Sequence, residues 1–287
     1  MSTPLSNDDF INCWNEILVP KWIRFRHILS GNGKFHSDLA YKYFDFQKGD
    51  KVLDIGCGFG ETSLELGQMV GESGEVFGLD CTKAFLDIAN DERDAASSSN
   101  VSYELADAQV YEFKKNYYDA AFSRFGVMFF QSAVMAMKNC HHALKPGGKL
   151  CLIVWRTLDD NPCWRLAKEV ALKHLPPPGD KAQTCGPGPF SMTSEETDRA
   201  MLKAAGFTDV ELFQRVDVDA FMGSNVDEAI DFQILVGPSG EIIREAGDLG
   251  EEKLPLIRAE LTELLEPYMT AQGIMMPSSS WAIMARK

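Results

Sequence analysis

The sequence predicts an α/β protein in which helices cover both faces of a parallel sheet. Two observations predict it: short apolar segments alternate with helical segments between residues 51 and 155, and a glycine-rich turn at 56–60 follows the first of them. Of the 287 residues, 45% are hydrophobic and 24% are charged, as in ordinary globular proteins. This length suits one large α/β domain, or a core domain with an appendage.

The elements of this central region are predicted from their apolar patterns and from the glycines and prolines that end them. The strands are expected at Lys51–Ile55, Glu75–Asp80, Val101–Leu105, Tyr118–Ser123 and Lys149–Trp155. The helices between them are expected at Thr62–Val70, Ala84–Ala95 and Ala133–Leu144. Such alternation implies right-handed crossovers between parallel strands.

The two ends of the chain have a different character. Residues 1–45 are helical in pattern and rich in aromatic residues, and they form either a helical layer on the sheet or a lid over a ligand, two compatible interpretations. Beyond residue 156 the chain is richer in proline and glycine turns. The elements expected there are helices at Ser194–Ala205, Val226–Val236 and Glu251–Tyr268, a long β segment at Val210–Phe221, and a final strand at Trp281–Arg286.

Charge and hydropathy exclude some classes of partner. The 28 basic and 42 acidic residues give a net charge of −14, which repels a polyanion, and the densest basic stretch, Lys21–His27, is short. We therefore expect no nucleic-acid partner. The longest strongly apolar run, Leu150–Trp155, is far too short to cross a bilayer, so no membrane insertion is expected.

Cysteine and histidine usage points to a cytoplasmic protein without a metal site. The seven cysteines form no C-x-x-C pair, and Met1–Phe10 is polar and acidic, unlike a signal peptide, so we expect reduced thiols in the cytoplasm. No cysteine or histidine cluster has metal-ligand spacing, and the adjacent His141 and His142 point to different faces of a helix.

The glycine-rich turn favours a particular kind of nucleotide ligand. Gly56, Gly58 and Gly60 let the backbone approach a ligand closely, and a helix N-terminus follows them. The spacing G-x-G-x-G differs from the dinucleotide pattern, and Glu61 stands where a third dinucleotide glycine would be. Asp54 suits a ligand with an ammonium group. This combination favours a nucleoside that carries an amino acid over NAD or FAD.

Two further acidic residues follow the next strands. Asp80 ends the second strand, where a carboxylate can accept hydrogen bonds from ribose hydroxyls, and Asp107 follows the third, where it can accept from an adenine amino group. Either residue alone is as well explained as a helix cap. As an ordered set with the glycine turn and Asp54, they predict a ligand site at the carboxyl edge of the sheet.

With these residues the sequence resembles the class I S-adenosylmethionine-dependent methyltransferases, in particular the small-molecule group that includes the ubiquinone/menaquinone C-methyltransferases. The resemblance rests on VLDIGCGFG at 52–60, VFGLD at 76–80, ADA at 106–108, SRFGVMFF at 123–130 and LKPGGKL at 144–150. It implies a Rossmann-like, seven-stranded, mostly parallel sheet with an antiparallel last strand. It also implies methyl transfer from S-adenosylmethionine to a small-molecule substrate.

The resemblance assigns roles to the matching positions. The cofactor-binding residues it implies are Asp54, Gly56, Cys57, Gly58 and Gly60 for the methionine end, Asp80 for the ribose, Cys81, Asp107 and Ala108 for the adenine, and Ser123, Arg124 and Phe125 beside the transferred methyl group. The domain organisation expected is a helical lid at 1–45 and a cofactor-binding domain at 46–287. Within that domain, inserts at 157–200 and 222–280 would shape the substrate site.

No catalytic base is identifiable from the sequence. His27 and His36 are interpreted as exposed surface residues, Cys57 as a packing residue, and residues 128–130 as lining a substrate pocket or covering the core. The acceptor atom and the oligomeric state are left open. Three alternatives also remain: an NAD- or FAD-dependent oxidoreductase, a protein or peptide methyltransferase, and a non-catalytic protein that has kept the cofactor-binding fold.

Overall fold

The computed structural model describes residues 7–179, 182 and 185–287, and it confirms the predicted α/β architecture. Residues 1–6 of the predicted polar N-terminus and four residues of the 157–200 insert lie outside the described residues. The strands of the sheet are β1 Lys51–Ile55, β2 Glu75–Asp80, β3 Val101–Leu105, β4 Tyr118–Arg124, β5 Leu144–Trp155, β6 Asp209–Gly223, β7 Met269–Thr270 and β8 Gly273–Arg286.

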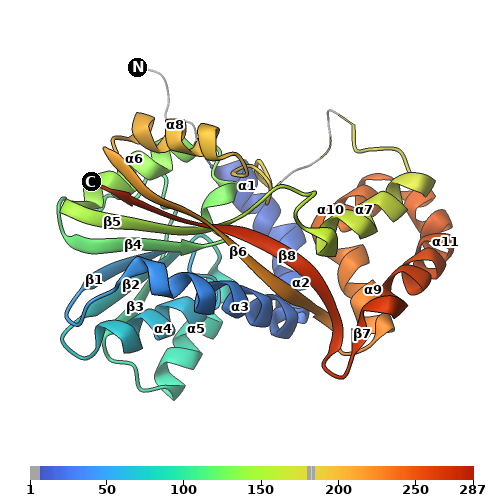
Figure 1. The fold of residues 1–287 in the computed structure, drawn as a ribbon, viewed down its shortest axis with the longest axis horizontal. Coiled ribbons are helices and arrows are strands. Elements are labelled where there is room, and N and C mark those ends of the chain that lie inside the picture. The colour runs from blue at the N-terminus through green and yellow to red at the C-terminus, as the bar shows by residue number, and fades with distance from the viewer. Residues whose placement is uncertain (1–6, 180–181, 183–184) are drawn as a thin grey trace.

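The sheet has the predicted topology. Seven of its strands follow the order β3-β2-β1-β4-β5-β8-β6, and the short β7 pairs with β8 (Figure 1). The first five strands are parallel to one another, and β8 runs antiparallel to both of its long neighbours, β5 and β6. The predicted antiparallel last strand is therefore confirmed. The glycine turn after β1 lies at the carboxyl edge of the sheet, the edge at which open α/β sheets bind ligands.

Helices cover both faces of the sheet, and the core is divided accordingly. The helices are α1 Asp8–Cys13, the π-helical turn η1 Trp14–Leu18, α2 Val19–Arg24, α3 Arg26–Phe44, α4 Glu61–Val70, α5 Lys83–Ala95, the 3₁₀ turn η2 Val127–Phe129, α6 Ala133–Ala143, α7 Pro162–His174, α8 Glu195–Ala205, α9 Val226–Leu235, α10 Gly237–Glu245, α11 Asp248–Leu265 and the 3₁₀ turn η3 Glu266–Tyr268. Helices α3 and α4 pack with Val52 on one face, whereas α6 packs with Leu53 on the other, because successive strand residues point to opposite faces.

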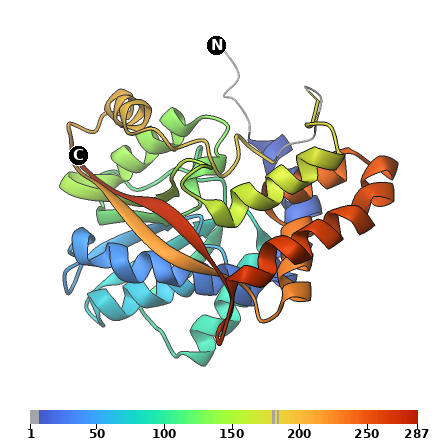
Figure 2. The same ribbon diagram turned by 45° about the vertical axis from the view of Figure 1, so that its right-hand side comes forward.

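A second group of helices stands beside the sheet. Helices α7, α9, α10 and α11 contact one another, and we call them the cap (Figure 2). The paired strands β6 and β8 extend from the sheet to this group, and α9–α11 lie in the chain between them (Figure 1). No helix in the described part of the chain is both long enough and apolar enough to cross a membrane.

The structure corrects the predicted start of the last strand and adds helices α7 and α10, which were not predicted. The final strand begins at Gly273 rather than Trp281, so the end of the predicted 222–280 insert is strand. Pro277 and the serines after it are weak strand formers, but pairing with β6 along nearly the whole of β8 outweighs this local preference. Helix α10 was not predicted, because its opening Gly-Pro-Ser-Gly sequence is typical of a turn; Pro238 instead occupies its first turn, where the missing N–H costs nothing.

Candidate functional site

A cavity of about 540 Å³ lies between the carboxyl edge of the sheet and the cap. Its walls come from the glycine turn, the residues after β2, β3 and β4, one face of the N-terminal helices, the loop at 185–190, and the cap helices α7 and α10. Segments far apart in sequence therefore enclose one volume. The N-terminal helices contribute to this wall from α1 through the first part of α3, and α3 also contacts β5, β6 and β8 and packs against the sheet.

The glycine turn gives the cavity a bare backbone surface. Gly56, Gly58 and Gly60 have φ values of 67°, 56° and 85°, a region that disfavours residues with a Cβ. A Cβ on Gly58 would have no heavy atom within 4 Å, so this residue leaves open space beside the backbone. Gly56 and Gly58 line the cavity, whereas Gly60 faces Tyr103 and Ala89 and begins α4.

Asp54 lies behind this turn rather than in the cavity wall. It is fully buried, and its Oδ2 accepts hydrogen bonds from Thr62 Oγ1 at 2.7 Å and Ser63 Oγ at 2.6 Å. Its Oδ1 has no donor among the residues that the structure describes. Burial raises the pKa of this carboxyl to about 6, with the two hydroxyls opposing the rise. Asp54 thus retains one acceptor atom to which nothing is bonded.

Asp80 and Asp107 both line the cavity. Asp80 accepts the N–H groups of Gly58 and Thr82, one on each carboxylate oxygen and each at 2.9 Å, which leaves a further lone pair on both atoms. Burial raises the pKa of Asp80 and also that of Asp107, which accepts the Gln109 N–H at 2.9 Å. Two carboxylates with free acceptor capacity therefore face the same space.

The remaining predicted site residues divide between wall and core. Those that line the cavity are Cys57, Cys81, Ala108, Arg124 and Phe125. Ser123 is fully buried instead, and its Oγ donates to the Ile55 carbonyl at 2.7 Å. Arg124 donates to Ser37 Oγ at 3.1 Å, and Phe125 stacks on Trp155 with ring centroids 4.1 Å apart.

The negative charge of Glu61 is compensated within the protein. Its carboxylate accepts hydrogen bonds from the Arg26 guanidinium and from Ser30 Oγ, at 2.8 to 3.1 Å. Repulsion between Glu61 and a pyrophosphate would therefore be weak, because Arg26 compensates the charge of Glu61. The glycine spacing is unaffected and remains the stronger evidence against a dinucleotide.

Aromatic side chains line much of the cavity, and Trp14 and Trp22 also pack against Phe59 of the glycine turn. Trp14 packs edge-on against Trp22 and Phe129, with ring centroids 5.2 and 4.9 Å apart. Met128, Phe129 and Phe130 all line the cavity, which supports the pocket-lining interpretation of residues 128–130. Trp155 and Trp164 were not predicted here; the signal available was their position at the end of a strand and in the insert that follows it.

His36 is not the exposed residue that the sequence suggested. It is fully buried, with Nε2 bonded to Ser278 Oγ and Nδ1 to Ser280 Oγ, both at 2.8 Å. Burial lowers its pKa to about 3, and the nearby Arg124 charge acts in the same direction. The prediction failed because the two serines that accommodate the ring lie on β8, more than 200 residues away. His27 is exposed as predicted, and it pairs with Glu228.

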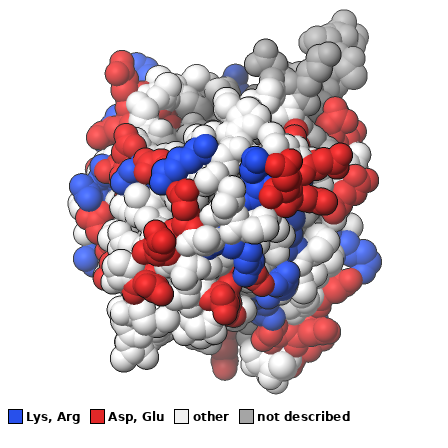
Figure 3. Space-filling model, turned by 90° about the vertical axis from the view of Figure 1, so that its right-hand side faces the viewer, with Lys and Arg blue, Asp and Glu red and all other residues white. Residues whose placement is uncertain are grey.

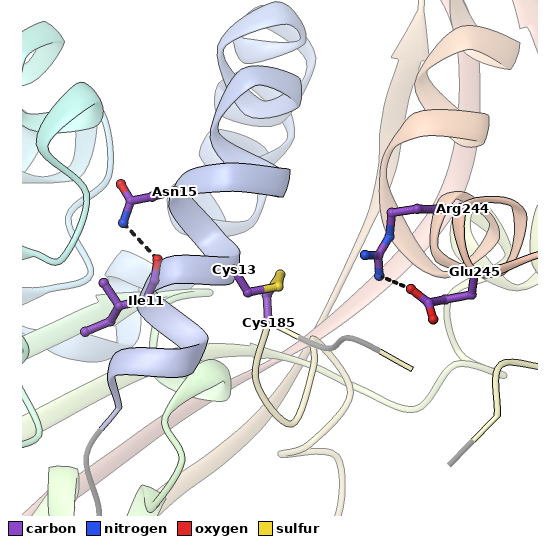
Figure 4. Close-up of a disulfide and its surroundings, with 6 residues drawn as sticks. All are labelled: Ile11, Cys13, Asn15, Cys185, Arg244 and Glu245. Atoms are coloured by element: carbon purple, nitrogen blue, oxygen red, sulfur yellow. Dashed lines mark hydrogen bonds and ion pairs between the residues drawn. A yellow bond between two sulfur atoms is a disulfide. The ribbon is translucent and has the colours of Figure 1, made fainter. Parts of the chain in front are cut away.

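The expectation of seven reduced thiols is also corrected. Cys13 at the end of α1 and Cys185 in the loop between α7 and α8 form a disulfide, with Cα atoms 5.0 Å apart (Figure 4). The two residues are 172 positions apart, so no spacing pattern could have signalled the pair. The other five cysteines are free. The disulfide joins two segments of the cavity wall.

The residues that the structure describes contain no group of three or more His, Cys, Asp or Glu side chains placed to hold a metal ion. On the face formed by the cap, acidic and basic side chains are interspersed and no continuous basic surface appears (Figure 3). Of the basic stretch 21–27, Arg24 pairs with Asp231 and Arg26 with Glu61 and Glu92.

Known proteins share the sheet-edge half of this architecture. Residues 52–148 match the family model described as "Methyltransferase domain". The 2-phytyl-1,4-naphtoquinone methyltransferase of Synechococcus elongatus is 29% identical over 148 residues, which are 51% of this chain and 63% of that protein. The demethylmenaquinone methyltransferase of Staphylococcus aureus is 32% identical over 134 residues, 46% of this chain and 55% of that protein.

Among solved structures, a putative methyltransferase from Bacillus halodurans has the same fold, with a TM-score of 0.57 and 18% identity over 88% of this chain and 99% of that one. The chain spans less than two thirds of the length of the curated relatives above. Residues 52–148 thus match a methyltransferase domain, and the predicted resemblance to the class I S-adenosylmethionine-dependent methyltransferases is confirmed. The cap lies outside the residues that the family model matches.

Proposed function

We propose that this protein transfers a methyl group from S-adenosylmethionine to a small-molecule acceptor. One observation carries the proposal: a single cavity of about 540 Å³ joins the glycine turn, Asp80 and Asp107 to a space walled by aromatic rings. A nucleoside ligand fits the polar end, and an apolar acceptor fits the aromatic end. One volume that holds both ligands is what a direct transfer between them requires.

The residues at the polar end fit this cofactor. The open space at Gly58 admits a ligand next to the backbone, and the free lone pairs of Asp80 suit the ribose hydroxyls. We assign Asp107 and Ala108, with Cys81, to the adenine. Asp54, through its unbonded Oδ1, would act on the methionine ammonium group, and Gly60 and Ser123 would hold the turn and strand in place from behind.

S-adenosylmethionine supplies a methyl group already activated on a positively charged sulfur, so the protein's task is chiefly to position the acceptor and exclude water. Phe125, stacked on Trp155, and Trp14, packed on Phe129, provide the dry walls. We assign no catalytic residue. His36 is held by two serines, and its low pKa makes it a poor base at neutral pH.

For the acceptor we propose an apolar or aromatic metabolite. The aromatic lining supports this, and so do the quinone substrates in the names of the two relatives. A protein or peptide acceptor is the second candidate. A peptide acceptor is disfavoured because the aromatic end of the cavity lies beneath the cap, and a peptide would have to enter this space. A non-catalytic binding protein is the third, since one fold hosts many functions.

We also propose a cytoplasmic location, where the Cys13–Cys185 disulfide would have to resist reduction or would be reduced. In the cytoplasm this pair would be exposed to the reducing glutathione pool. Alkylation in intact cells, followed by mass spectrometry, would measure its state. Seven alkylated cysteines would fit a reduced cytoplasmic protein, whereas five would favour an oxidising compartment or a protected disulfide.

The test of the function is a calorimetric titration of the stripped protein with S-adenosylmethionine and S-adenosylhomocysteine, with NADH as the control. The expected result is one molecule of either sulfur ligand per chain and no binding of NADH. Transfer of labelled methyl groups into a metabolite extract then tests catalysis. Binding without transfer to any metabolite would favour the non-catalytic alternative, and binding of NADH alone would favour an oxidoreductase.

A further inference from the structure

We propose that the cap end of the cavity binds an anionic group of the acceptor through Lys21, Lys168 and Arg244. The inference rests on the proposed function and narrows it. The acceptor would be an apolar or aromatic molecule that carries a carboxylate or a phosphate, rather than a neutral ring compound.

The three cations come from different helices but line the same cavity. Lys21 lies on α2, Lys168 on α7 and Arg244 in the last turn of α10. Lys168 follows Trp164 by four residues, so both project from one face of α7, and both line the cavity. Positively charged groups therefore stand next to the aromatic walls.

The two ends of the cavity differ in charge. Asp80, Asp107 and Glu61 lie at the sheet edge with one cation, Arg124, whereas the cap end has the three cations and one carboxylate, that of Glu241. A ligand that spans the aromatic part would therefore meet acceptor groups at one end and donors at the other. This arrangement orients an acceptor whose anionic group lies away from the cofactor.

Among the described residues, neither Lys21 nor Lys168 has a carboxylate partner. The chain has 42 acidic and 28 basic residues, so carboxylate partners are plentiful. Yet within residues 7–179, 182 and 185–287, no salt bridge involves Lys21 or Lys168, whereas Arg244 pairs with Glu245 at 3.0 Å (Figure 4). Two unpaired ammonium groups in a cavity wall are typical of a site in which the ligand supplies the negative charge.

The surroundings of Lys21 further favour the binding of an anionic group. The side chain is half-buried, and burial lowers its pKa, as does the positive charge of Arg244. A cation held near another cation is destabilised until an anion binds between them. A neutral quinone would leave this repulsion in place, whereas a carboxylate or phosphate would relieve it.

The test uses three probes with one ring system: 2-naphthoate, 2-naphthyl phosphate and the neutral 2-naphthamide. Their affinities are measured by calorimetry on the full chain, at low and high salt, with and without S-adenosylhomocysteine. At least one anionic probe should bind about tenfold more tightly than the amide, and salt should reduce the difference. The tighter anion identifies the group that the site prefers. Equal affinities for all three would overturn the inference.

Substitutions of the two lysines test whether these residues cause the preference for the anionic probes. Lys21→Gln and Lys168→Gln should each reduce the preference for the anion, and the double variant should abolish it. Lys203→Gln removes the same charge from the exposed face of α8 and should change nothing. A preference that survives in the double variant overturns the assignment.

The same titrations separate this inference from the proposed function. The affinity for S-adenosylhomocysteine should be unchanged in Lys21→Gln and Lys168→Gln. If it falls while the naphthoate preference persists, the lysines serve the cofactor's own carboxylate, and the inference is overturned. If wild-type protein binds no S-adenosylhomocysteine, the proposed function fails, while the anion preference is still decided by the probes.

Discussion

The two ends of the cavity are assembled in different ways. At the sheet edge, Gly58, Asp80 and Asp107 follow three strands that are consecutive in sequence. At the cap end, Lys21, Lys168 and Arg244 come from helices separated by other parts of the chain. The family match covers the first end and stops before most of the second. A ligand site built from consecutive strand ends can be predicted from a sequence motif, whereas one built from distant helices can be identified only in the folded structure.

The largest expected effect is on stability, and it concerns the disulfide that holds the 185–190 loop of the cavity wall. Reducing the Cys13–Cys185 disulfide removes a covalent link between the N-terminal helices and the 185–190 loop. Releasing a loop of 172 residues should lower the free energy of unfolding by about 3–5 kcal/mol. Urea unfolding with and without a phosphine reductant measures this. Cys185→Ser should show the same loss and no response to reductant, and identical midpoints for wild type under both conditions would contradict the prediction.

The next effect concerns the sheet edge alone. Asp80→Ala should weaken the binding of S-adenosylhomocysteine by roughly tenfold to a few hundredfold, because two ribose hydroxyls lose their acceptor. Binding of 2-naphthoate at the cap end should be unchanged, which would separate the two ends. Calorimetry measures both affinities, and urea unfolding checks that the fold is intact. An unchanged cofactor affinity would eliminate the ribose assignment.

His36 packs against Phe125 and Trp155, two aromatic rings of the cavity wall. Its pKa is about 3 in the folded protein and about 6.5 when unfolded, so between these values the unfolded chain binds a proton that the folded chain does not. Its stabilising contribution is complete above pH 6.5 and falls with pH, by about 1.4 kcal/mol per unit.

The measurement is urea unfolding of wild type and His36→Asn at pH 5.0 and pH 7.5. Wild type should lose about 2 kcal/mol more than the variant on going to the lower pH. Asp54 and Asp198 have raised pKa values and titrate with the opposite sign, but both proteins contain them, so the difference isolates His36. Parallel pH profiles would show that the buried ring is not what titrates.

The smallest effect compares two glycines of α3. A Cβ on Gly31 would meet nothing within 4 Å, whereas one on Gly33 would lie 2.8 Å from Arg124 Nε. Gly31→Ala should therefore stabilise the protein by about 0.5–1 kcal/mol through helix propensity. Gly33→Ala should gain little and should weaken cofactor binding by displacing Arg124. Equal behaviour of the two variants in urea unfolding and calorimetry would argue against the role given to Arg124.

The sequence predicts the sheet well, because its strands are local apolar runs with glycine or acidic residues at their ends. The same locality locates Gly58, Asp80 and Asp107 in the cavity wall. Asp54 and Ser123 match the same motifs, but their side chains lie behind the wall, a placement that the sequence does not indicate. No alternation or spacing distinguishes a side chain that lines the cavity from one that lies behind its wall.

The features missed in the sequence all depend on long-range pairing. His36 is buried by serines on β8, Cys13 meets Cys185, and β8 extends past Pro277 because β6 lies beside it. Each of these depends on which distant segment becomes a neighbour. Local preference carries no such information, and tertiary packing overrides it.

The ribbon of β6 and β8 has a consequence for how such proteins diversify. Gly223 pairs with Ile274, so the two points at which the chain leaves and rejoins the ribbon are adjacent in space. Everything between them, from α9 to β7, is an excursion whose ends already meet. A hairpin turn of a few residues would close that gap without disturbing the register of the sheet. The segment is thus suited to transplantation: a different helical insert, grafted at 223 and 274, would present a new chamber to the same edge of the sheet.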